Sequence, residues 1–594
     1  MKLLKNEIIK VLENVGIKNP LIEKPPQEAN ADLAFPCFSL AKSMNKNPVD
    51  IAYELAVKMV QSKHIKDIDV AGPYINFHAD WSKLGQLVLK DIAKNKDKYG
   101  SGTKKKKNVL IEHTSADPHG PLNIEHFRNS VLGDSIARLI SFSGSNVSTI
   151  FFVNDTGRQI AIATTEYLKR PLEKGRKPDW WVLDLYLNGN RVLEKDEKFK
   201  ACVEDNIRKF EAGDSGLRKN FELITGECLK GFRQTLAGLG ITIGEFYTES
   251  TLLNTGAVKA LLEDARKLPE TRMDKGRLWI DLTKFGIDRE FTITREDGTT
   301  LYPARDMAFH RYKFSKADAN VNVIGTDQKF YFKQLNSALS LLHPKEAENY
   351  SMVFYEFLTL PEGSMSTRAG RFVSVDDVME KALKLAEKVV NEKMPHYAPS
   401  VKKDIAKAVG VGALKYVMIK ASPEKTYAFS VEEALSFEGN NAPYIQYTHA
   451  RARSILSKAA ISAFPDFHAK FLTWPHEVAL LRKLSEFPEA AELAARDMRP
   501  HYIATYAYEL ATIFNEFYQA VPVLKAAEPG GAAIIQKNLP LNHISRSPLA
   551  KTRKKMNIGP DPMVKQSRLA LVMAVALVLK RSLELLGIEA PDKM

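Results

Sequence analysis

A loop that follows a short apolar segment holds the polar residues best placed to do chemistry. Residues 108–112 (Asn-Val-Leu-Ile-Glu) run into Asp117-Pro118-His119-Gly120-Pro121, and a helical pattern starts after Asn123. Exposed amides and the positive end of a helix dipole attract phosphates. Hydrogen-bond donors placed there also stabilise charge that develops on a phosphate. The loop is therefore a candidate phosphate-binding site.

Three histidines in this region, His113, His119 and His126, raise the alternative of a metal site. Their spacing does not place all three on one helical face, and His113 is better explained as a strand or core residue. The three cysteines are far apart in the chain and form no Cys-x-x-Cys pair. We therefore expect no metal site in the protein itself and reduced cysteines, as in a cytoplasmic protein.

The elements around the loop have the order of a doubly wound α/β sheet. A strand at 108–112, a helix through Val131, Ile136 and Leu139, and a strand at 148–153 form a β-α-β start. Further strands are expected at 278–282, 299–302, 321–324 and 352–355. A charged helical stretch at about 163–245 is expected to split this nucleotide-binding, Rossmann-like sheet as an insertion.

Two further domains are expected to flank the sheet domain, which we place at residues 101–395. Residues 1–100 open with an amphipathic helix and contain two short strands around Gly72-Pro73, the pattern of a small α/β unit. Residues 396–594 read almost entirely as helix, which predicts an all-α domain. A Gly, Pro and Lys-rich stretch at about 526–566 interrupts it.

The chain length and charge exclude some classes of protein. With 594 residues the chain is too long for one small binding module, and 85 Lys+Arg against 71 Asp+Glu leave a net charge of +14. Such a charge suits a polyanionic partner but does not distinguish tRNA from other nucleic acids or from a merely basic surface. The longest apolar run, Leu569 to Leu579, is short of the roughly 20 residues of a membrane span, and we expect no membrane helix.

Several motifs carry a resemblance to a known family. Residues 112–130 resemble the first-strand loop of class I aminoacyl-tRNA synthetases, and Ser364-Met365-Ser366-Thr367-Arg368 resembles their Lys-Met-Ser-Lys-Ser element. Residues 153–159 (Val-Asn-Asp-Thr-Gly-Arg-Gln), 301–306 (Leu-Tyr-Pro-Ala-Arg-Asp) and 440–451 are similar to arginyl-tRNA synthetases, particularly of the archaeal type. The resemblance extends over nearly the whole chain.

This resemblance implies ATP-dependent attachment of arginine to tRNA(Arg) through an arginyl-adenylate, with Mg²⁺ accompanying ATP. The catalytic residues it implies are Asn123, His126, Ser366, Thr367 and Arg368. Contacts to ATP are expected from Gly325, Asp327 and Met365. Gly325 lies at the end of a predicted strand, where open α/β sheets place ligands, although an ordinary strand-ending turn would also explain it.

For arginine, the resemblance implies a pocket of Glu249, Tyr302 and Asp306, with Gln328 nearby and Asp117 at the substrate amino group. A planar guanidinium with five donors requires carboxylate and hydroxyl acceptors, so these residue types fit. Many families have Asn where Asp117 stands, and either residue can accept from an ammonium. The alternative for residues 302–306 is a strand end and a helix cap with an internal ion pair.

For tRNA, the resemblance implies contacts from the N-terminal residues Tyr74 and Asn76 to the elbow, although the two could equally be a buried strand pair. In the helical domain, Tyr444 and Arg451, with Tyr447 between them, match the anticodon-binding bundle. Most of these side chains are expected to pack the bundle, with only some facing RNA. No oligomerisation signal is evident, and we expect a monomer.

Two positions depart from the His-Ile-Gly-His element of the family. Asn123 replaces the first histidine and Glu125 replaces the glycine, which brings bulk and negative charge beside ATP. Two hypotheses therefore remain: an active arginyl-tRNA synthetase with a divergent ATP loop, or a catalytically weak or inactive paralogue that binds tRNA or arginine. A dinucleotide-dependent oxidoreductase is excluded, since no Gly-x-Gly-x-x-Gly follows the first strand.

Overall fold

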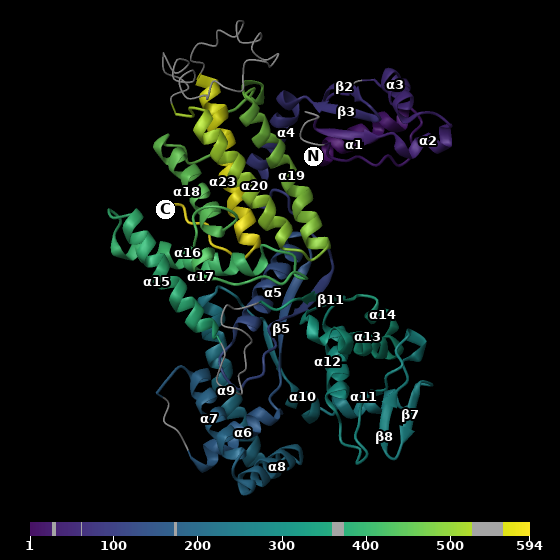
Figure 1. Ribbon diagram of the computed structural model, residues 1–594, viewed down its shortest axis with the longest axis vertical. Coiled ribbons are helices and arrows are strands. Elements are labelled where there is room, and N and C mark those ends of the chain that lie inside the picture. The colour runs from purple at the N-terminus through teal and green to yellow at the C-terminus, as the bar shows by residue number, and fades with distance from the viewer. Residues whose placement is uncertain (26–30, 61, 171–174, 359–372, 525–561) are drawn as a thin grey trace.

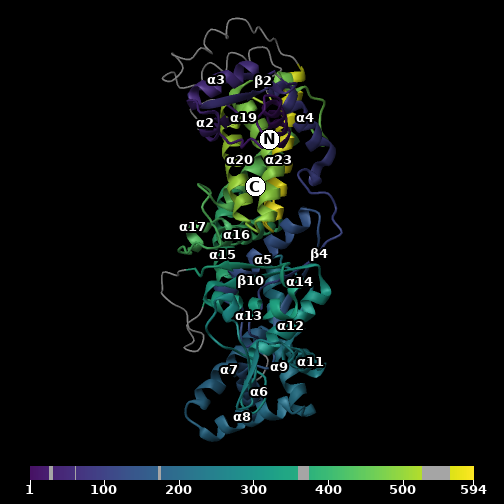
Figure 2. The ribbon, with the colours of Figure 1, turned by 90° about the vertical axis from the view of Figure 1, so that its right-hand side faces the viewer.

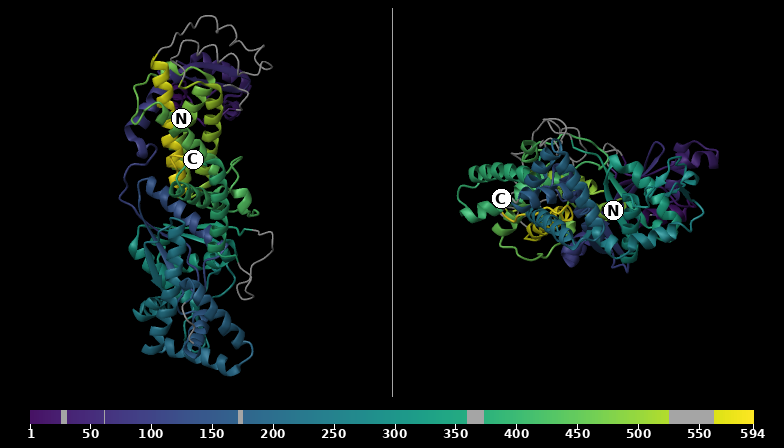
Figure 3. Two further views of the ribbon diagram at one scale, coloured as in Figure 1. Left: turned by 90° about the vertical axis from the view of Figure 1, so that its left-hand side faces the viewer. Right: turned by 90° about the horizontal axis from the view of Figure 1, so that it is seen from below.

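The computed structural model describes residues 1–25, 31–60, 62–170, 175–358, 373–524 and 562–594. The molecule is elongated (Figures 1 and 2). A helical bundle and a small N-terminal domain form one end, and the central sheet and its insertions extend to the other. Both chain ends lie in the half that contains the bundle (Figures 1 and 3).

A five-stranded parallel sheet forms the middle of the molecule, in the order β11-β10-β4-β5-β6. Its strands are β4 (Asn108–Glu112), β5 (Asn146–Val153), β6 (Glu245–Thr248), β10 (Ala319–Gly325) and β11 (Tyr350–Tyr355). Every residue of β10 is buried, as expected of a central parallel strand covered on both faces. Helix α5 (Ile124–Phe142) connects β4 to β5. The predicted doubly wound sheet is confirmed.

Two of the predicted strands do not belong to the parallel sheet. Strand β8 (Arg277–Ile280) belongs to a separate antiparallel sheet with β7 (Thr271–Asp274) and β9 (Phe291–Thr292). The expected strand at 299–302 is wrong, because Tyr302 begins helix α12 (Tyr302–Lys316). Pro303 explains this start: its fixed φ and missing N–H suit the first turn of a helix.

The insertion between β5 and β6 consists of helices α6 (Arg158–Lys169), α7 (Pro178–Leu193), α8 (Glu197–Glu211) and α9 (Ser215–Gly238). Asp376, in the first turn of α15 (Val375–Lys393), connects it to the rest of the chain. The Asp376 carboxylate accepts from Lys177 Nζ at 2.7 Å, from Trp180 Nε1 at 3.0 Å and from Thr235 Oγ1 at 2.9 Å. These bonds fix the insertion against the start of α15.

Short helices complete the part of the chain around the sheet. They are α10 (Glu249–Asn254), α11 (Ala257–Ala265), η3 (Thr283–Phe285), η4 (Thr326–Gln328), α13 (Lys329–Leu342) and α14 (Pro344–Ala347). Helices α10, α12 and η4 all begin within a few residues of a β-strand or bridge. The first turns of α10 and η4 therefore lie at the carboxyl edge of the parallel sheet, directly after β6 and β10.

The N-terminal domain is a three-stranded antiparallel sheet in the order β1-β3-β2. Its elements are α1 (Lys2–Asn14), β1 (Leu33–Pro36), α2 (Phe38–Met44), α3 (Pro48–Lys58), β2 (Ile65–Ala71) and β3 (Tyr74–Ala79). Gly72 adopts φ +57° between β2 and β3, a conformation that favours glycine in a tight turn. The predicted first helix and hairpin are confirmed.

Helix α19 (Pro475–Arg496) of the bundle is the surface on which the N-terminal domain packs. The amino group of Met1 donates to Ser485 O at 2.6 Å, and burial lowers the pKa of this amine to about 6. Lys5 Nζ lies 2.5 Å from the Glu489 carboxylate. Helix α4 (Trp81–Asn95), followed by η2 (Lys96–Lys98), also packs on α19. The N-terminal domain and the C-terminal bundle thus pack against each other.

The C-terminal part is helical, as predicted. It comprises α16 (Pro399–Ile419), α17 (Val431–Ala434), α18 (Ala442–Lys458), η6 (Ala469–Phe471), α19, α20 (His501–Ala520) and α23 (Pro562–Leu585). By length and composition, α23 is apolar enough to cross a membrane. The longest unbroken apolar run, Leu569 to Leu579, had not indicated this. Helix α23 packs against α18, α19 and α20, and 67% of its apolar window is buried in the protein.

A buried ion pair inside the bundle gives a test of this packing. Arg568 Nε lies 2.7 Å from Glu477 Oε1, with side chains 6% and 0% exposed. Glu477→Ala should lower the free energy of unfolding of the bundle by roughly 3–5 kcal/mol, because it leaves a buried guanidinium unpaired. The measurement is urea unfolding followed by circular dichroism. The control Glu492→Ala, which removes the exposed pair with Lys2, should cost less than about 1 kcal/mol; equal losses would contradict the assignment.

Candidate functional site

A cavity of about 220 Å³ opens at the carboxyl ends of β4, β10 and β11, where an open α/β sheet places its ligands. It is lined by Glu112, Thr114, Ser115, Glu125, His126, Asn129, Asn322, Val323, Ile324, Gly325, Asp327, Gln328, Phe332, Tyr355 and Phe357. Five of the lining positions were singled out in the sequence, namely Glu125, His126, Gly325, Asp327 and Gln328. Gln328 thus lies on the cavity that also contains Gly325 and Asp327.

The start of helix α5 forms one wall of the cavity, with Asn123 as its N-cap residue. The Asn123 side-chain oxygen accepts from the amides of Glu125 at 3.0 Å and His126 at 2.9 Å. The amide of Ile124 donates to Val373 O at 3.1 Å. The expectation of exposed amides at this helix start is therefore wrong: the first three donate within the protein.

His126 completes this capping arrangement. Its Nδ1 accepts from the backbone amide of Asn123 at 3.3 Å, and burial lowers the pKa of the imidazole to about 4. The neutral ring with an accepting Nδ1 carries its proton on Nε2. His126 can therefore offer one N–H donor to a ligand in the cavity.

Glu125 and Asp327 bring negative charge to the same cavity. Burial, with the nearby Asp327 charge added, raises the pKa of Glu125. Gly325 lies close to two neighbours: a Cβ at this position would be 2.6 Å from Asp327 Oδ1 and 2.9 Å from Phe357 Cζ. Close packing, not a left-handed backbone, is what requires glycine there.

A group of carboxylates adjoins the cavity. Asp306, on the first turns of α12, accepts from the Tyr331 hydroxyl at 2.5 Å. Burial raises the pKa of Asp306 to about 7, and the charges of Glu112 and Glu249 contribute to this rise. Burial also raises the pKa of Glu249, and the charge of Asp117 adds to it. Crowded, desolvated carboxylates of this kind favour the binding of a cation.

The internal ion pair considered as an alternative for residues 302–306 is not among the ion pairs of the described residues, because Arg305 pairs with a residue outside this segment. Arg305 Nε lies 3.2 Å from Glu249 Oε1. Thr156, just before α6, donates to the Glu249 carboxylate and accepts from Arg305 Nη1. Tyr302 is 57% exposed, and its ring centre lies 5.0 Å from that of Tyr331. Both tyrosines thus lie beside Asp306.

Glu112 was not singled out as a site residue, yet it lines the cavity and its charge acts on Asp306. Its Oε2 lies 2.5 Å from Lys313 Nζ and 2.8 Å from Asn322 Nδ2. Lys313 is buried, with its ammonium also bonded to Asn322 Oδ1 at 2.8 Å. The sequence did contain a signal for Glu112. It is the charged residue that ends an apolar strand, next to the candidate loop.

One group of predicted catalytic and nucleotide-binding residues cannot be placed. Ser364, Met365, Ser366, Thr367 and Arg368 lie outside the described residues. The structure does describe both flanks of that segment: Glu356 O accepts from Arg128 Nη1, and Val375 N donates to Leu122 O at 2.9 Å. Both flanks are therefore bonded to α5 or to the loop before it.

The N-terminal pair on β3 is divided between surface and interior. Tyr74 is half-buried, and its ring packs edge-on against Phe38 with centres 5.6 Å apart. Asn76 is only 3% exposed and donates to Asp69 Oδ1 at 2.9 Å. An RNA contact by the Asn76 side chain is therefore not supported, because its amide is already used inside the domain.

Helices α18 and α20 present an aromatic cluster around Arg451. The guanidinium carbon of Arg451 lies 4.8 Å from the ring centres of both Tyr447 and Tyr518, which are partly exposed. Arg451 also donates to Asn515 Oδ1. Tyr444 packs against Tyr508 with ring centres 5.7 Å apart. A planar cation between exposed rings is a surface on which nucleic-acid bases can stack.

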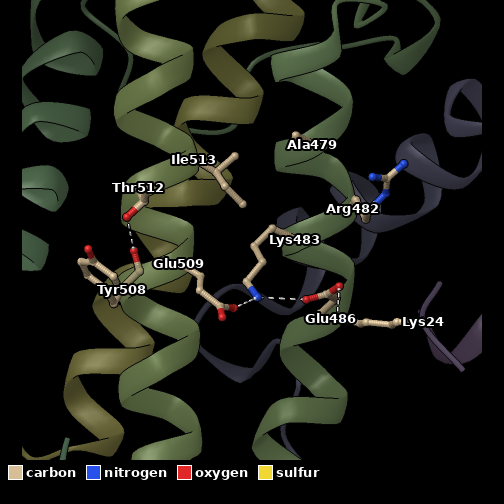
Figure 4. Close-up of a pocket in the computed structure, with 9 residues that line it drawn as sticks. All are labelled: Lys24, Ala479, Arg482, Lys483, Glu486, Tyr508, Glu509, Thr512 and Ile513. Atoms are coloured by element: carbon tan, nitrogen blue, oxygen red, sulfur yellow. Dashed lines mark hydrogen bonds and ion pairs between the residues drawn. The ribbon is translucent and has the colours of Figure 1, made fainter. Parts of the chain in front are cut away.

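A larger cavity, of about 440 Å³, lies away from the sheet between α19 and α20 (Figure 4). Its charged groups neutralise one another: Lys483 contacts Glu509 and also Glu486 at 3.0 Å, and Lys24 contacts Glu486 at 2.6 Å.

Within the described residues, no group of three or more His, Cys, Asp or Glu side chains could hold a metal ion. His113 is buried next to α5.

Comparisons with known proteins cover the whole chain. Residues 88–431 match the family described as "tRNA synthetases class I (R), catalytic domain". Residues 445–594 match "DALR anticodon binding domain", and residues 2–79 match "Arginyl tRNA synthetase N terminal domain". The three matches correspond to the sheet domain, the helical bundle and the N-terminal domain, respectively.

Individual relatives agree with these matches. The chain is 37% identical over 571 residues to an arginine–tRNA ligase of Methanosarcina barkeri, covering 95% of this chain and 94% of the relative. It is 35% identical to that of Methanocaldococcus jannaschii, covering 100% and 98%. The solved arginyl-tRNA synthetase of Thermus thermophilus superposes with a TM-score of 0.82 at 27% identity, covering 100% of both chains. The chain belongs to the arginyl-tRNA synthetase family of class I aminoacyl-tRNA synthetases.

Proposed function

We propose that the protein attaches arginine to tRNA(Arg) in an ATP-dependent reaction that passes through an arginyl-adenylate. The observation that carries this proposal is the group of desolvated carboxylates, Glu249 and Asp306 above all, beside a cavity at the carboxyl edge of the parallel sheet. A carboxylate group suits the guanidinium of arginine, and the sheet edge suits a nucleotide. Arginine and ATP would then meet at the ends of β4 and β10.

In this proposal Asp306 and Glu249 accept hydrogen bonds from the substrate guanidinium, and Tyr302 contacts it from the exposed side. Asp117 and Glu112 accept from the substrate amino group. Arg305 already lies against Glu249, so the substrate shares that carboxylate with a protein guanidinium. A pocket built to hydrogen-bond a substrate rejects analogues that leave those bonds unmade by roughly 10⁴-fold, which would exclude lysine.

ATP is assigned to the cavity, with contacts from Gly325, Asp327, Gln328 and the Nε2–H donor of His126. The arginine carboxylate attacks the α-phosphorus, pyrophosphate leaves, and a hydroxyl of the terminal tRNA adenosine then attacks the arginyl carbonyl and releases AMP. Met365, Ser366, Thr367 and Arg368 stay predicted contacts to the nucleotide. Mg²⁺ enters as the counter-ion of the ATP phosphates.

In this proposal Asn123 caps α5 and does not donate to the phosphates, as the sequence had suggested it would. Its oxygen faces the helix amides, which supports an indirect role: holding His126 in place. For tRNA, the partial exposure of Tyr74 supports an elbow contact, and Arg451 with Tyr444, Tyr447 and Tyr518 supports an anticodon contact. The unpaired Cys37 and Cys228 are buried, in keeping with a protein of the cytoplasm.

Glu125 provides the first test. Two unit charges a few ångströms apart near a protein surface interact by a few kcal/mol. Glu125→Gly should therefore lower the KM for ATP at least about tenfold in an arginine-charging assay with tRNA(Arg) and Mg²⁺. Wild-type charging comparable to that of family members supports the enzyme. Charging that appears only in Glu125→Gly or Asn123→His would instead support the catalytically weak paralogue, which the relatives described above do not favour.

The raised pKa of Glu125 adds a pH dependence to this test. As pH falls through that pKa, the carboxyl becomes neutral and repels the phosphates less, so the KM for ATP of the wild type should fall. Glu125→Gln lacks this titration and serves as the matched control for protonation of ATP itself. An identical pH profile in the two proteins would show that Glu125 does not face the nucleotide.

Asp306 provides the second test. Because its pKa is raised to about 7, roughly half of the molecules carry a proton there at pH 7. Binding of a guanidinium requires the carboxylate, so arginine binding should release protons near pH 7 and weaken as pH falls from 8 to 6. Calorimetric titrations in two buffers with different ionisation enthalpies measure this release.

Asp306→Asn should abolish the proton release and weaken arginine binding by roughly 10- to 100-fold, the value of a hydrogen bond to a charged group. Binding of a non-hydrolysable ATP analogue should change little. Proton release that persists in the Asn variant would assign the titration to another group. Equal weakening of arginine and of the ATP analogue would contradict the placement of Asp306 in an arginine pocket.

A further inference from the structure

Arg128 is a fully buried guanidinium on α5, 0% exposed, just behind the residues that line the cavity. Its Nη1 donates to Glu356 O, and its Nη2 donates to Pro423 O and Lys425 O, both at 3.2 Å. The ring of Tyr427 lies 5.0 Å from its Cζ. Among the described residues it forms no ion pair with a carboxylate. Backbone carbonyls and the Tyr427 ring contact the guanidinium, and the charges of Glu356 and Glu424 act on it without a direct ion pair.

The first segment held by Arg128 is a wall of the cavity. Glu356 lies between Tyr355 and Phe357, which both line the cavity. The backbone of Glu356 is fixed on two sides, because its carbonyl accepts from Arg128 and its amide donates to Pro423 O at 2.9 Å. Loss of the guanidinium would release the carbonyl side of this residue.

The second segment held by Arg128, residues 422–427, is called the junction segment here. Its other side is bonded to Arg499, which precedes α20. Arg499 Nη2 donates to Glu424 Oε1 at 2.7 Å, and Nη1 donates to Ser422 Oγ at 3.0 Å. Helix α20 carries Asn515 and Tyr518, which contact Arg451. The junction segment therefore lies between the cavity wall and the aromatic cluster of the bundle.

We propose that Arg128 is a positioning residue: it fixes the Tyr355–Phe357 wall of the nucleotide cavity and links that wall, through the junction segment, to α20. The proposal rests on the assignment of ATP to this cavity. A planar guanidinium with donors in a fixed fork can bridge the four carbonyls that Arg128 meets on two segments, which a lysine ammonium cannot do with the same geometry. Occupation of the bundle by tRNA then alters the affinity of the cavity for nucleotide.

The first arm of the test is Arg128→Lys, which keeps the charge and removes the fork. The dissociation constant of a non-hydrolysable ATP analogue, measured by calorimetry, should rise on the order of 10- to 100-fold, since a misplacement of about 1 Å has effects of that size. Arginine affinity should stay within about twofold. Arg138→Lys, on the exposed side of the same helix, is the matched control and should change neither value.

An unchanged analogue affinity in Arg128→Lys would overturn the positioning role. Equal weakening of arginine and analogue would also overturn it, because a general loss of structure weakens both. The analogue binds without any charging step, so its dissociation constant can be measured whether or not the protein is catalytically active. A wild type that binds the analogue but charges no tRNA would refute the proposed function and leave the positioning role standing.

The second arm tests the link to the bundle with Glu424→Gln, which removes the partner of Arg499 at a partly exposed position and should fold normally. The wild type should bind the analogue with different affinity in the presence and absence of tRNA(Arg), and Glu424→Gln should reduce this ratio towards 1. Arg496→Gln, which removes the neighbouring exposed pair with Asp497, is the control. A ratio in Glu424→Gln equal to that of the wild type would overturn the link.

A double-mutant cycle joins the two arms. If Arg128 and Glu424 act through the same segment, Arg128→Lys should also reduce the ratio of analogue affinities with and without tRNA(Arg), and the double variant should reduce this ratio no further than the stronger single variant. Independent sites give additive effects, so full additivity would contradict a shared junction segment. If Arg128→Lys failed to fold, the ratio measured in Glu424→Gln would still decide the link.

Discussion

The candidate site depends on the placement of several carboxylates in a desolvated cleft. Burial raises the pKa of both Glu249 and Asp306, and the charge of Glu249 adds to the rise at Asp306. Without compensation such a group would take up protons, because desolvation disfavours the charged form. Arg305 and Thr156 beside Glu249, Tyr331 beside Asp306 and Lys313 beside Glu112 supply part of that compensation. A substrate guanidinium would supply the rest.

Helix α5 connects this cleft to the rest of the molecule. Its first turn forms the cavity wall, and Asn129 in its second turn bonds to Thr114 N at 2.6 Å and to Val323 O at 2.9 Å, which joins two strand ends. Further along, Asp134 lies 3.5 Å from the buried Lys415 of α16, whose pKa burial lowers to about 8. One helix thus contacts the cavity, the sheet and the bundle, which is why we assign Arg128 a positioning role.

Much of the fold followed from the sequence because it depends on local patterns. The apolar run of β10, the amphipathic spacing of α1 and the glycine turn between β2 and β3 each require only neighbouring residues to agree. The motifs also located Glu249, Asp306, Gly325 and Asp327. The strand prediction failed at residues 299–302. These strand-like residues run into α12, whose first turn contains Pro303.

The amino-acid sequence alone was enough to predict the class of sheet, the helical bundle and the basic charge, and to nominate residues for the proposed arginine pocket. Three features became evident from the folded chain alone: Asn123 turns its oxygen to its own helix, Asn76 is buried, and Arg305 pairs with Glu249. The fold also brought Glu112, Lys313 and Arg128 into the site. The reason is that hydrogen-bond partners and desolvation are set by segments far apart in the chain, and no local spacing specifies which of them will meet.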